Sequence, residues 1–266
     1  MGIATVQPDG KSMRRSKSSP QLARARNQID PSASAPACVF GVSFENRLGL
    51  AAGLDRTGRN FEELARCGVG HIEIGTLTDS ADLEFRYCGH RRRTKVGISI
   101  ASRRPGLDQQ VIDDYLRLSR NLSSTCDFLV ANLSSPHHAR NGNSRGIERL
   151  LEALKLEHDT HQDEPRCPLL VKLGLHEASM ELPVAVNIAR DLRLDGVVIA
   201  TPSMRILERV SRELHGIAVI SVGGIGTLND AKRRLCAGAS LVQVHSAYAR
   251  RGPACIADIL GDGGHS

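Results

Sequence analysis

Short apolar runs recur along the chain from Cys38 onward, and each is followed by a longer segment of mixed polarity. Apolar and polar residues hardly alternate within the runs, which is typical of parallel strands buried on both faces. We predict eight such strands, at Leu48–Ala52, His71–Ile74, Val96–Ile100, Phe128–Ala131, Leu169–Leu173, Gly196–Ala200, Ala218–Val222 and Leu241–Val244.

Several of the intervening segments have the period of an amphipathic helix, and in three of them the apolar residues fall on one helical face. These faces are formed by Leu107, Val111, Tyr115 and Leu118, by Ile147, Leu150, Leu151 and Leu154, and by Ile206, Leu207, Val210 and Leu214. Thr227 and Asp230 predict a capping box before a helix at Ala231–Cys236, which Gly238 ends. The segment 77–95 has the weakest helical pattern.

Eight alternating β and α units in about 230 residues predict an α/β fold, the (β/α)8 TIM barrel. Two β-prone runs precede the first strand, and we expect Cys38–Phe40 and Val42–Phe44 to form a small hairpin that closes the bottom of the barrel. Residues 1–36 are rich in Ser, Arg and Pro and hold few large apolar residues. We therefore expect a disordered basic tail over 1–36 and the barrel over 37–266.

Composition narrows the classes of function and the compartment. Aromatic residues make up 3% of the chain and Trp is absent, which argues against a stacking platform for single-stranded nucleic acid. The seven cysteines are scattered and form no CxxC pair, so we expect a reduced compartment and no metal site. No apolar run approaches the ~18 residues that span a bilayer. We expect a cytoplasmic protein, although the acid-poor tail weakly resembles an organellar transit peptide.

The net charge of +6 is concentrated in two places. One is the tail, and the other is a block that contains Arg86, Arg91, Arg92, Arg93, Lys95, Arg103 and Arg104. Such runs can bind nucleic acid or acidic lipid. The alternative is a disordered tail and a solvated loop, and we favour it, so we expect no nucleic-acid partner.

Glycine and polar residues gather where the predicted strands end, and in (β/α)8 barrels active sites lie at the C-terminal ends of the strands. The segments are AAGLDR (51–56), GTLT (75–78), NLSSPHH (132–138), VGGIG (222–226) and VHSA (244–247). By residue type alone NLSSPHH is also compatible with an ordinary turn. Its place after the fourth strand favours a functional role.

Lys172 lies inside an apolar strand, where a lysine is rarely buried without a partner. Two interpretations are open: it forms an ion pair with a carboxylate, or it faces an anionic ligand. The glycines of VGGIG open a capped helix, and backbone N–H groups at such a position can bind an anion. Phosphate sites between the seventh and eighth loops are common in this fold. Paired glycines also serve plain turns.

Seven motifs together resemble the dihydroorotate dehydrogenase family, whose members are FMN-containing (β/α)8 barrels. The resemblance runs from about Cys38 to the C-terminus, in the family's order and spacing. The motifs are GLAAGLDRTGRN (49–60), GVGHIEIGTLT (68–78), NLSSPHH (132–138), LLVKLG (169–174), DGVVIATPS (195–203), and GGIGTLNDAKRRLCAGAS and LVQVHSAYARRGP within 223–253. The double serine looks like the class 2, quinone-linked branch.

The resemblance implies roles for individual residues. Ser135 would be the general base that takes a proton from the substrate carbon, with Lys172 near the flavin N1/O2 edge. The substrate would be bound by Arg56, Asn132, His137 and Thr201. The cofactor FMN would be bound by Ala52, Gly53, Gly75, Thr76, Ser99, Asn132, Lys172, Gly223, Gly224, His245 and Ser246, the last four at its phosphate.

The chain departs from the family pattern mainly at substrate contacts. Arg56 stands where the family has a carboxylate-binding lysine, and His137 and Ser99 stand where it has asparagine. The strand ending is Ala200-Thr201-Pro202 instead of Asn-Thr-Thr. The asparagine-rich loop after strand two, the glycine-rich loop after strand six and the apolar N-terminal helices of class 2 have no counterpart.

Three functional hypotheses follow. The first is an FMN-dependent oxidoreductase that dehydrogenates dihydroorotate or a related cyclic amide or acid, as in pyrimidine biosynthesis, with an unidentified electron acceptor that is a quinone in the related branch. The second is a divergent barrel with weak or lost FMN binding that acts as a binding or regulatory protein. The third is a basic barrel that binds nucleic acid. Flavin binding separates the first from the others.

Overall fold

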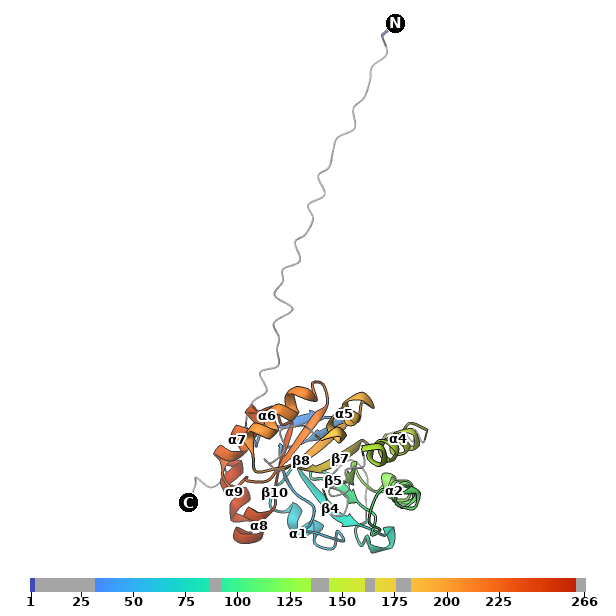
Figure 1. The fold of residues 1–266 in the computed structure, drawn as a ribbon. Coiled ribbons are helices and arrows are strands. Elements are labelled where there is room, and N and C mark those ends of the chain that lie inside the picture. The colour runs from blue at the N-terminus through green and yellow to red at the C-terminus, as the bar shows by residue number, and fades with distance from the viewer. Residues whose placement is uncertain (3–31, 87–91, 135–143, 161–165, 176–182, 262–266) are drawn as a thin grey trace. The chain divides into compact units, whose positions relative to one another are not determined.

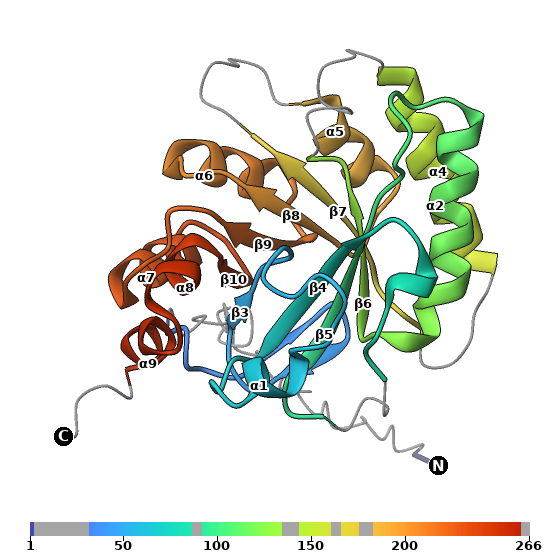
Figure 2. The same ribbon diagram turned by 90° about the horizontal axis from the view of Figure 1, so that it is seen from below.

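The computed structural model describes residues 1–2, 32–86, 92–134, 144–160, 166–175 and 183–261. In these residues, eight parallel strands close into a barrel in the order β10-β3-β4-β5-β6-β7-β8-β9 (Figures 1 and 2). The strands are β3 (Leu48–Leu50), β4 (His71–Leu77), β5 (Lys95–Ile100), β6 (Phe128–Asn132), β7 (Leu169–Gly174), β8 (Gly196–Ala200), β9 (Ala218–Val222) and β10 (Leu241–Val244). The predicted (β/α)8 barrel is confirmed.

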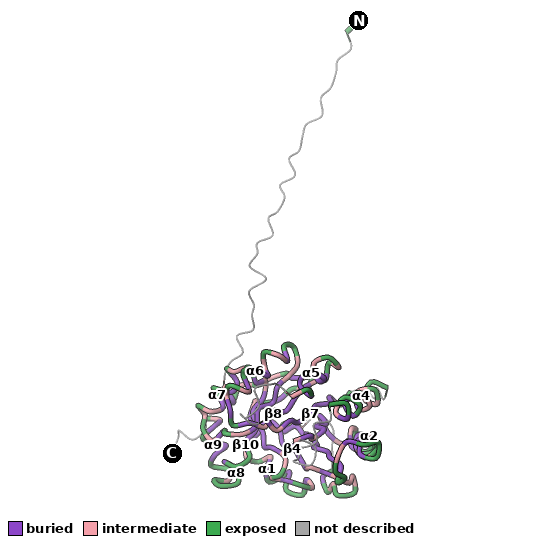
Figure 3. Tube along the Cα trace, in the orientation of Figure 1, coloured by how far each residue is buried: buried purple, intermediate pink, exposed green. Residues whose placement is uncertain are grey.

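Helices pack around the outside of the barrel (Figure 2). They are α1 (Phe61–Ala65), α2 (Gln109–Leu122), α4 (Ser144–Thr160), α5 (Val184–Asp191), α6 (Met204–Glu213), α7 (Leu228–Cys236), α8 (Ser246–Arg251) and α9 (Ala254–Leu260), with 3-10 turns η2 (Ser80–Asp82) and η3 (Ser123–Thr125). The apolar residues that define the predicted faces of α2, α4 and α6 are mostly buried. Figure 3 shows that exposed residues are common in the helices and that the strands are largely buried. In the described part of the weakly helical segment 77–95, η2 is the helical element.

Two apolar layers hold the fold together. The larger layer lies between the strands and the surrounding helices, and the smaller one fills the barrel interior. The predicted hairpin, β1 (Ala37–Val39) with β2 (Val42–Phe44), belongs to the inner layer. Phe40 and Phe44 pack against Phe128, with ring centroids 5.5 and 6.3 Å apart. Because Phe128 begins β6, the hairpin closes the N-terminal end of the barrel, as predicted.

His71 is an unusual member of this inner layer. Its ring lies 5.5 Å from that of Phe44 and 6.0 Å from that of Phe128, and it is fully buried. Neither ring nitrogen has a hydrogen-bond partner among the described residues. Burial penalises the charged form and lowers the pKa of His71 to about 3. A Cβ at Gly49 would lie 2.3 Å from this ring, so only glycine fits beside it.

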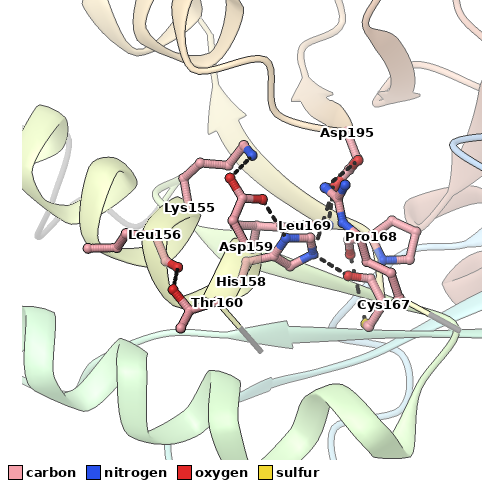
Figure 4. A network of polar contacts seen from close by, with 10 residues as sticks. Lys155, Leu156, His158, Asp159, Thr160, Cys167, Pro168, Leu169 and Asp195 are labelled. Atoms are coloured by element: carbon pink, nitrogen blue, oxygen red, sulfur yellow. Dashed lines mark hydrogen bonds and ion pairs between the residues drawn. The ribbon is translucent and has the colours of Figure 1, made fainter. Parts of the chain in front are cut away.

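A polar network joins the end of α4 to the beginnings of β7 and β8, away from the C-terminal ends of the strands (Figure 4). Arg166 donates two hydrogen bonds of 3.0 Å to the carboxylate of Asp195, which also accepts the backbone N–H of Leu169 at 2.8 Å. A ring nitrogen of His158 contacts the carbonyl of Cys167. These charged groups are engaged in holding the helix to the sheet.

Four arginines of the second basic block have carboxylate partners. Arg92 pairs with Glu62 at 2.6 Å and Arg93 with Glu45 at 2.8 Å. Arg103–Asp82 and Arg104–Asp114 are each separated by 3.3 Å. The positive charge of these four arginines is therefore locally balanced. The absence of a nucleic-acid partner remains a prediction.

The expected tail, residues 1–36, lies mostly outside the described residues and remains a prediction. The first long described range begins at Ser32, and the carbonyl of the buried Ala33 accepts a hydrogen bond of 2.8 Å from the N–H of Arg47. Within the described ranges, none of the helices combines the length and the apolar character needed to cross a membrane.

Candidate active site

Glycines with positive φ line the C-terminal end of the barrel between β9, β10 and β3. Gly223 has φ +106°, Gly224 has φ +67° and Gly53 has φ +103°, values that L side chains rarely adopt. A Cβ at Gly223 would lie 2.9 Å from the carbonyl oxygen of Thr201, and one at Gly53 would lie 3.0 Å from Nε2 of His245. The sequence uses glycine here because backbone and ring approach too closely for a side chain.

Gly223 and Gly224 border a cavity of about 300 Å³. Its lining comes from β10 and from the segments that follow β9 and β10, and it includes Gly223, Gly224, Asp230, Gln243, His245, Ser246 and Arg250. The predicted capping box of α7 is confirmed, and it has a consequence for the site. The Asp230 carboxylate accepts hydrogen bonds from the N–H groups of Gly226 and Thr227. A carboxylate of the protein itself therefore already occupies the N-terminus of α7. The binding of a phosphate at Gly223 and Gly224 remains a prediction.

A chain of hydrogen bonds crosses the ends of β4, β5 and β6. Thr76 Oγ1 lies 3.2 Å from Ser99 Oγ and accepts a bond of 2.9 Å from Asn132 Nδ2. Asn132 Oδ1 accepts the N–H of Ser134 at 2.9 Å and its hydroxyl at 2.6 Å. Tyr115 donates to the Asn132 carbonyl at 2.7 Å. The Asn132 side chain is thus held in one orientation, and the second N–H donor of its amide has no partner among the described residues.

Lys172 is nearly buried and has a carboxylate partner. Its Nζ donates to Oε1 of Glu73 at 3.1 Å, and the Glu73 side chain is completely buried. Gln243 donates to the other Glu73 oxygen at 3.0 Å. Of the two interpretations of Lys172, the ion pair is therefore present. Oε1 of Gln243 is buried and has no partner in the described part of the chain, although Gln243 lines the cavity.

The loop after β3 is fixed by Asp55 and presents Arg56. The buried Asp55 carboxylate accepts the N–H groups of Gly58 at 2.9 Å and Asn60 at 3.1 Å, and burial raises its pKa despite these bonds. Gly53 and Gly75 are joined by a bond of 2.8 Å from N–H to carbonyl. Arg56 is exposed and makes no ion pair with any described residue. A contact between Arg56 and a substrate remains a prediction.

The turn from β8 into α6 consists of residues 201–203, as expected from the missing glycine-rich loop. Thr201 is buried, and its hydroxyl accepts the N–H of Ser203 at 3.2 Å. Ser203 caps α6. A contact between Thr201 and substrate remains a prediction. Ser135 and His137 lie outside the described residues, so their roles remain predictions too.

Three residues of this region were missed by the sequence reasoning: Glu73, Gln243 and Arg234. Glu73 and Gln243 are polar residues inside apolar stretches, which is the signal that drew attention to Lys172. Arg234 follows Lys232 and Arg233 in a basic run and carries no such signal. The other predicted residues Ala52, Gly75, Thr76, Ser99, Gly223, Gly224, His245 and Ser246 lie at the strand ends around the barrel mouth. The fold therefore brings the described candidates to one face.

Known proteins are similar to this chain in sequence and in architecture. The family model described as dihydroorotate dehydrogenase matches residues 193–262. A dihydroorotate dehydrogenase (quinone) from Nocardioides sp. is 30% identical over 290 residues, covering 81% of this chain and 82% of the relative. One from Stenotrophomonas maltophilia is 27% identical, covering 85% and 82%.

The architecture also matches solved structures. DHODH from Eimeria tenella in complex with ferulenol superposes with a TM-score of 0.72 at 20% sequence identity, covering 88% of this chain and 85% of that one. This likeness shows the shared barrel. The identity to the Nocardioides enzyme over most of both chains goes further. The chain belongs to the dihydroorotate dehydrogenase family and is a divergent member similar to its quinone-linked enzymes.

Proposed function

We propose that this protein is an FMN-dependent oxidoreductase that dehydrogenates a CH–CH bond in dihydroorotate or in a related cyclic amide or acid. The observation that carries the proposal is the glycine-lined cavity at Gly223 and Gly224. It lies on the same barrel face as Thr76, Asn132 and Lys172. Family membership supports the reaction class, and the relatives' name assigns dihydroorotate and quinone to them.

The residues present fit the phosphate end of FMN. The cavity is bordered by two glycines whose neighbours leave little room for a Cβ, and by the exposed side chains of His245, Ser246 and Arg250. Backbone N–H groups, a hydroxyl, an imidazole and a guanidinium are groups that bind phosphate in proteins. The unpartnered Oε1 of Gln243 is an acceptor that a hydroxyl of a bound ligand would satisfy.

The remaining residues have roles that follow from their contacts. FMN supplies the hydride acceptor when it is bound. Lys172, held by Glu73, places a positive charge at the barrel mouth, where it would stabilise negative charge on a reduced cofactor. Asn132 is oriented by Thr76 and Ser134 to donate to a ligand amide or ring. Arg56 would bind a substrate carboxylate.

Ser135 is the proposed general base because it occupies the second serine of NLSSPHH. A serine hydroxyl is a weak base, so proton removal from carbon requires a relay to water or a site closed to bulk solvent. Thr201 and His137 are the proposed partners of the substrate amides. The electron acceptor of this chain is not assigned.

Gly224→Ala should weaken FMN binding by roughly tenfold, which corresponds to about 1.4 kcal/mol. The new Cβ would stand at the cavity wall, 3.1 Å from a nitrogen of Arg234, on a backbone with positive φ. Gly216→Ala is the matched control, because Gly216 also has positive φ but no atom lies within 4 Å of its Cβ position. Fluorescence titration of apoprotein measures both. Equal affinity in the two variants would contradict the placement of the phosphate.

Dihydroorotate itself should be a poor substrate. A site built to hydrogen-bond one ligand leaves buried polar groups unpaired with another, at roughly 1–3 kcal/mol each. Several positions differ from the family pattern here, including Arg56, His137 and Ala200. Reconstituted protein is mixed anaerobically with dihydroorotate and flavin absorbance is followed, with Ser135→Ala as the control. Rapid loss of the absorbance in wild type, slowed in Ser135→Ala, would show a working dihydroorotate pocket.

A further inference from the structure

Arg234 is a buried cation next to the cavity. Residue Arg234 on α7 is 2% exposed, and its guanidinium donates to the Thr201 carbonyl at 2.8 Å, the Ser221 hydroxyl at 3.0 Å and the Pro202 carbonyl at 2.8 Å. All three acceptors are neutral. Among the described residues Arg234 forms no salt bridge, and the carboxylate of nearby Asp230 is engaged by the N–H groups of Gly226 and Thr227.

The guanidinium lies directly against the cavity wall. Its Nη2 is 3.1 Å from the position that a Cβ on Gly224 would occupy, and Gly224 lines the cavity. The same guanidinium holds the carbonyls of Thr201 and Pro202, and the Thr201 carbonyl is 2.9 Å from the Cβ position of Gly223. Arg234 thus lies on the side of Gly223 and Gly224 that faces away from the cavity, and it does not line the cavity itself.

A buried charge that is hydrogen-bonded but not neutralised is costly unless an opposite charge lies near. In a low-dielectric interior that attraction is strong and weakly screened by salt. Burial lowers the pKa of Arg234, and the charge of the nearby Asp230 carboxylate offsets this only in part. A dianionic group on the far side of Gly224 would relieve this electrostatic cost.

We propose that Arg234 is a positioning residue that provides the buried counter-charge for a phosphate group bound against Gly223 and Gly224, and that it selects phosphorylated over unphosphorylated ligand. This inference rests on the proposed function. Arg234 acts through the glycine backbone and through the short turn at 201–203, which it holds in place.

The test compares FMN with riboflavin, which lacks the phosphate. Arg234→Met and Arg234→Gln, the latter keeping an N–H donor for the turn, should lower FMN affinity about tenfold, or about 1.4 kcal/mol. Riboflavin affinity should change less than about threefold, so the preference for FMN falls. Arg234→Lys keeps the charge and should restore most of the preference. Ser221→Ala removes one acceptor without changing charge and should leave the preference intact.

An unchanged ratio of the two affinities in a folded neutral variant, or an equal loss for both ligands, would overturn the proposal and leave Arg234 as a structural tie. If wild type binds neither FMN nor riboflavin, the proposed function is contradicted. The role of Arg234 as a counter-charge is then tested separately, with inorganic phosphate as the ligand. Phosphate should then raise the melting temperature of wild type more than that of Arg234→Gln, since a ligand stabilises the state it binds. An equal rise in both proteins would contradict the counter-charge.

Discussion

Lys172→Met should lower the free energy of unfolding by about 3–5 kcal/mol, the range for removing one partner of a buried ion pair. The cause lies in Glu73, whose carboxylate is completely buried and whose oxygens are bound by Lys172 and Gln243. Without the lysine, that carboxylate keeps a single neutral donor. Urea unfolding followed by circular dichroism measures the loss.

The double variant Lys172→Met with Glu73→Gln removes the uncompensated charge and should recover most of the lost stability. Arg93→Met is the matched control. It removes a cation from the Glu45 pair, whose arginine side chain is 85% exposed, and such solvent-screened pairs contribute little to stability. A Lys172→Met protein as stable as wild type would show that the ion pair is not structural.

The double variant also isolates the proposed chemical role of Lys172. If the lysine only balances Glu73, a refolded double variant with bound FMN should have the same reduction potential as wild type. If it also stabilises negative charge on the reduced cofactor, the potential should become more negative. We expect the second result, because the Lys172 charge lies on the barrel face that carries Thr76 and Asn132.

Acidification should destabilise the protein through His71. Its pKa is about 3 in the folded protein against 6.5 for an exposed histidine. Between these values the unfolded state binds more protons, so the free energy of unfolding falls as pH falls. The full stability is present above pH 6.5 and decreases toward pH 3. The slope attributable to His71 is about 1.4 kcal/mol per pH unit, and the total is on the order of 4–5 kcal/mol.

His71→Phe should remove this part of the pH dependence and equal or exceed wild-type stability at pH 8, because it eliminates two unpaired ring nitrogens. The measurement is the free energy of unfolding in urea from pH 8 to pH 5, taken as the difference between wild type and variant. His215→Gln alters an exposed histidine and should not change the slope. A difference between wild type and His71→Phe that stays constant with pH would rule out the linkage.

The barrel was predictable from the sequence because parallel strands buried on both faces leave a clear pattern. Apolar runs such as Gly196–Ala200 and Ala218–Val222 contain few residues that would indicate a helix or a turn, and their bounds match those of β8 and β9. The capping box at Thr227 and Asp230 was predictable for a similar reason, since it depends on neighbours in the chain. Because a barrel orders its strands by sequence, the strand ends carrying the candidate residues also followed from the pattern.

Contacts between strands distant in the chain could not be predicted in this way. Glu73 and Lys172 are 99 positions apart, and no local sequence pattern indicates that their side chains will form a hydrogen bond. The burial of His71 between Phe44 and Phe128 depends on how the hairpin closes the barrel. The hydrogen bond from Arg234 to the 201–203 turn depends on how α7 packs against the barrel. These are properties of packing, which single-residue patterns do not encode.

The visible absorption spectrum of the purified full-length chain, recorded before and after addition of FMN and removal of the excess, tests the flavoprotein proposal most directly. We predict the absorbance bands of oxidised flavin in a ratio approaching one FMN per chain after reconstitution, because the chain has one cavity bordered by Gly223 and Gly224 at the mouth of one barrel. A spectrum without flavin bands after FMN addition, from protein that is folded by circular dichroism, would contradict the proposal and favour a barrel that has lost its cofactor.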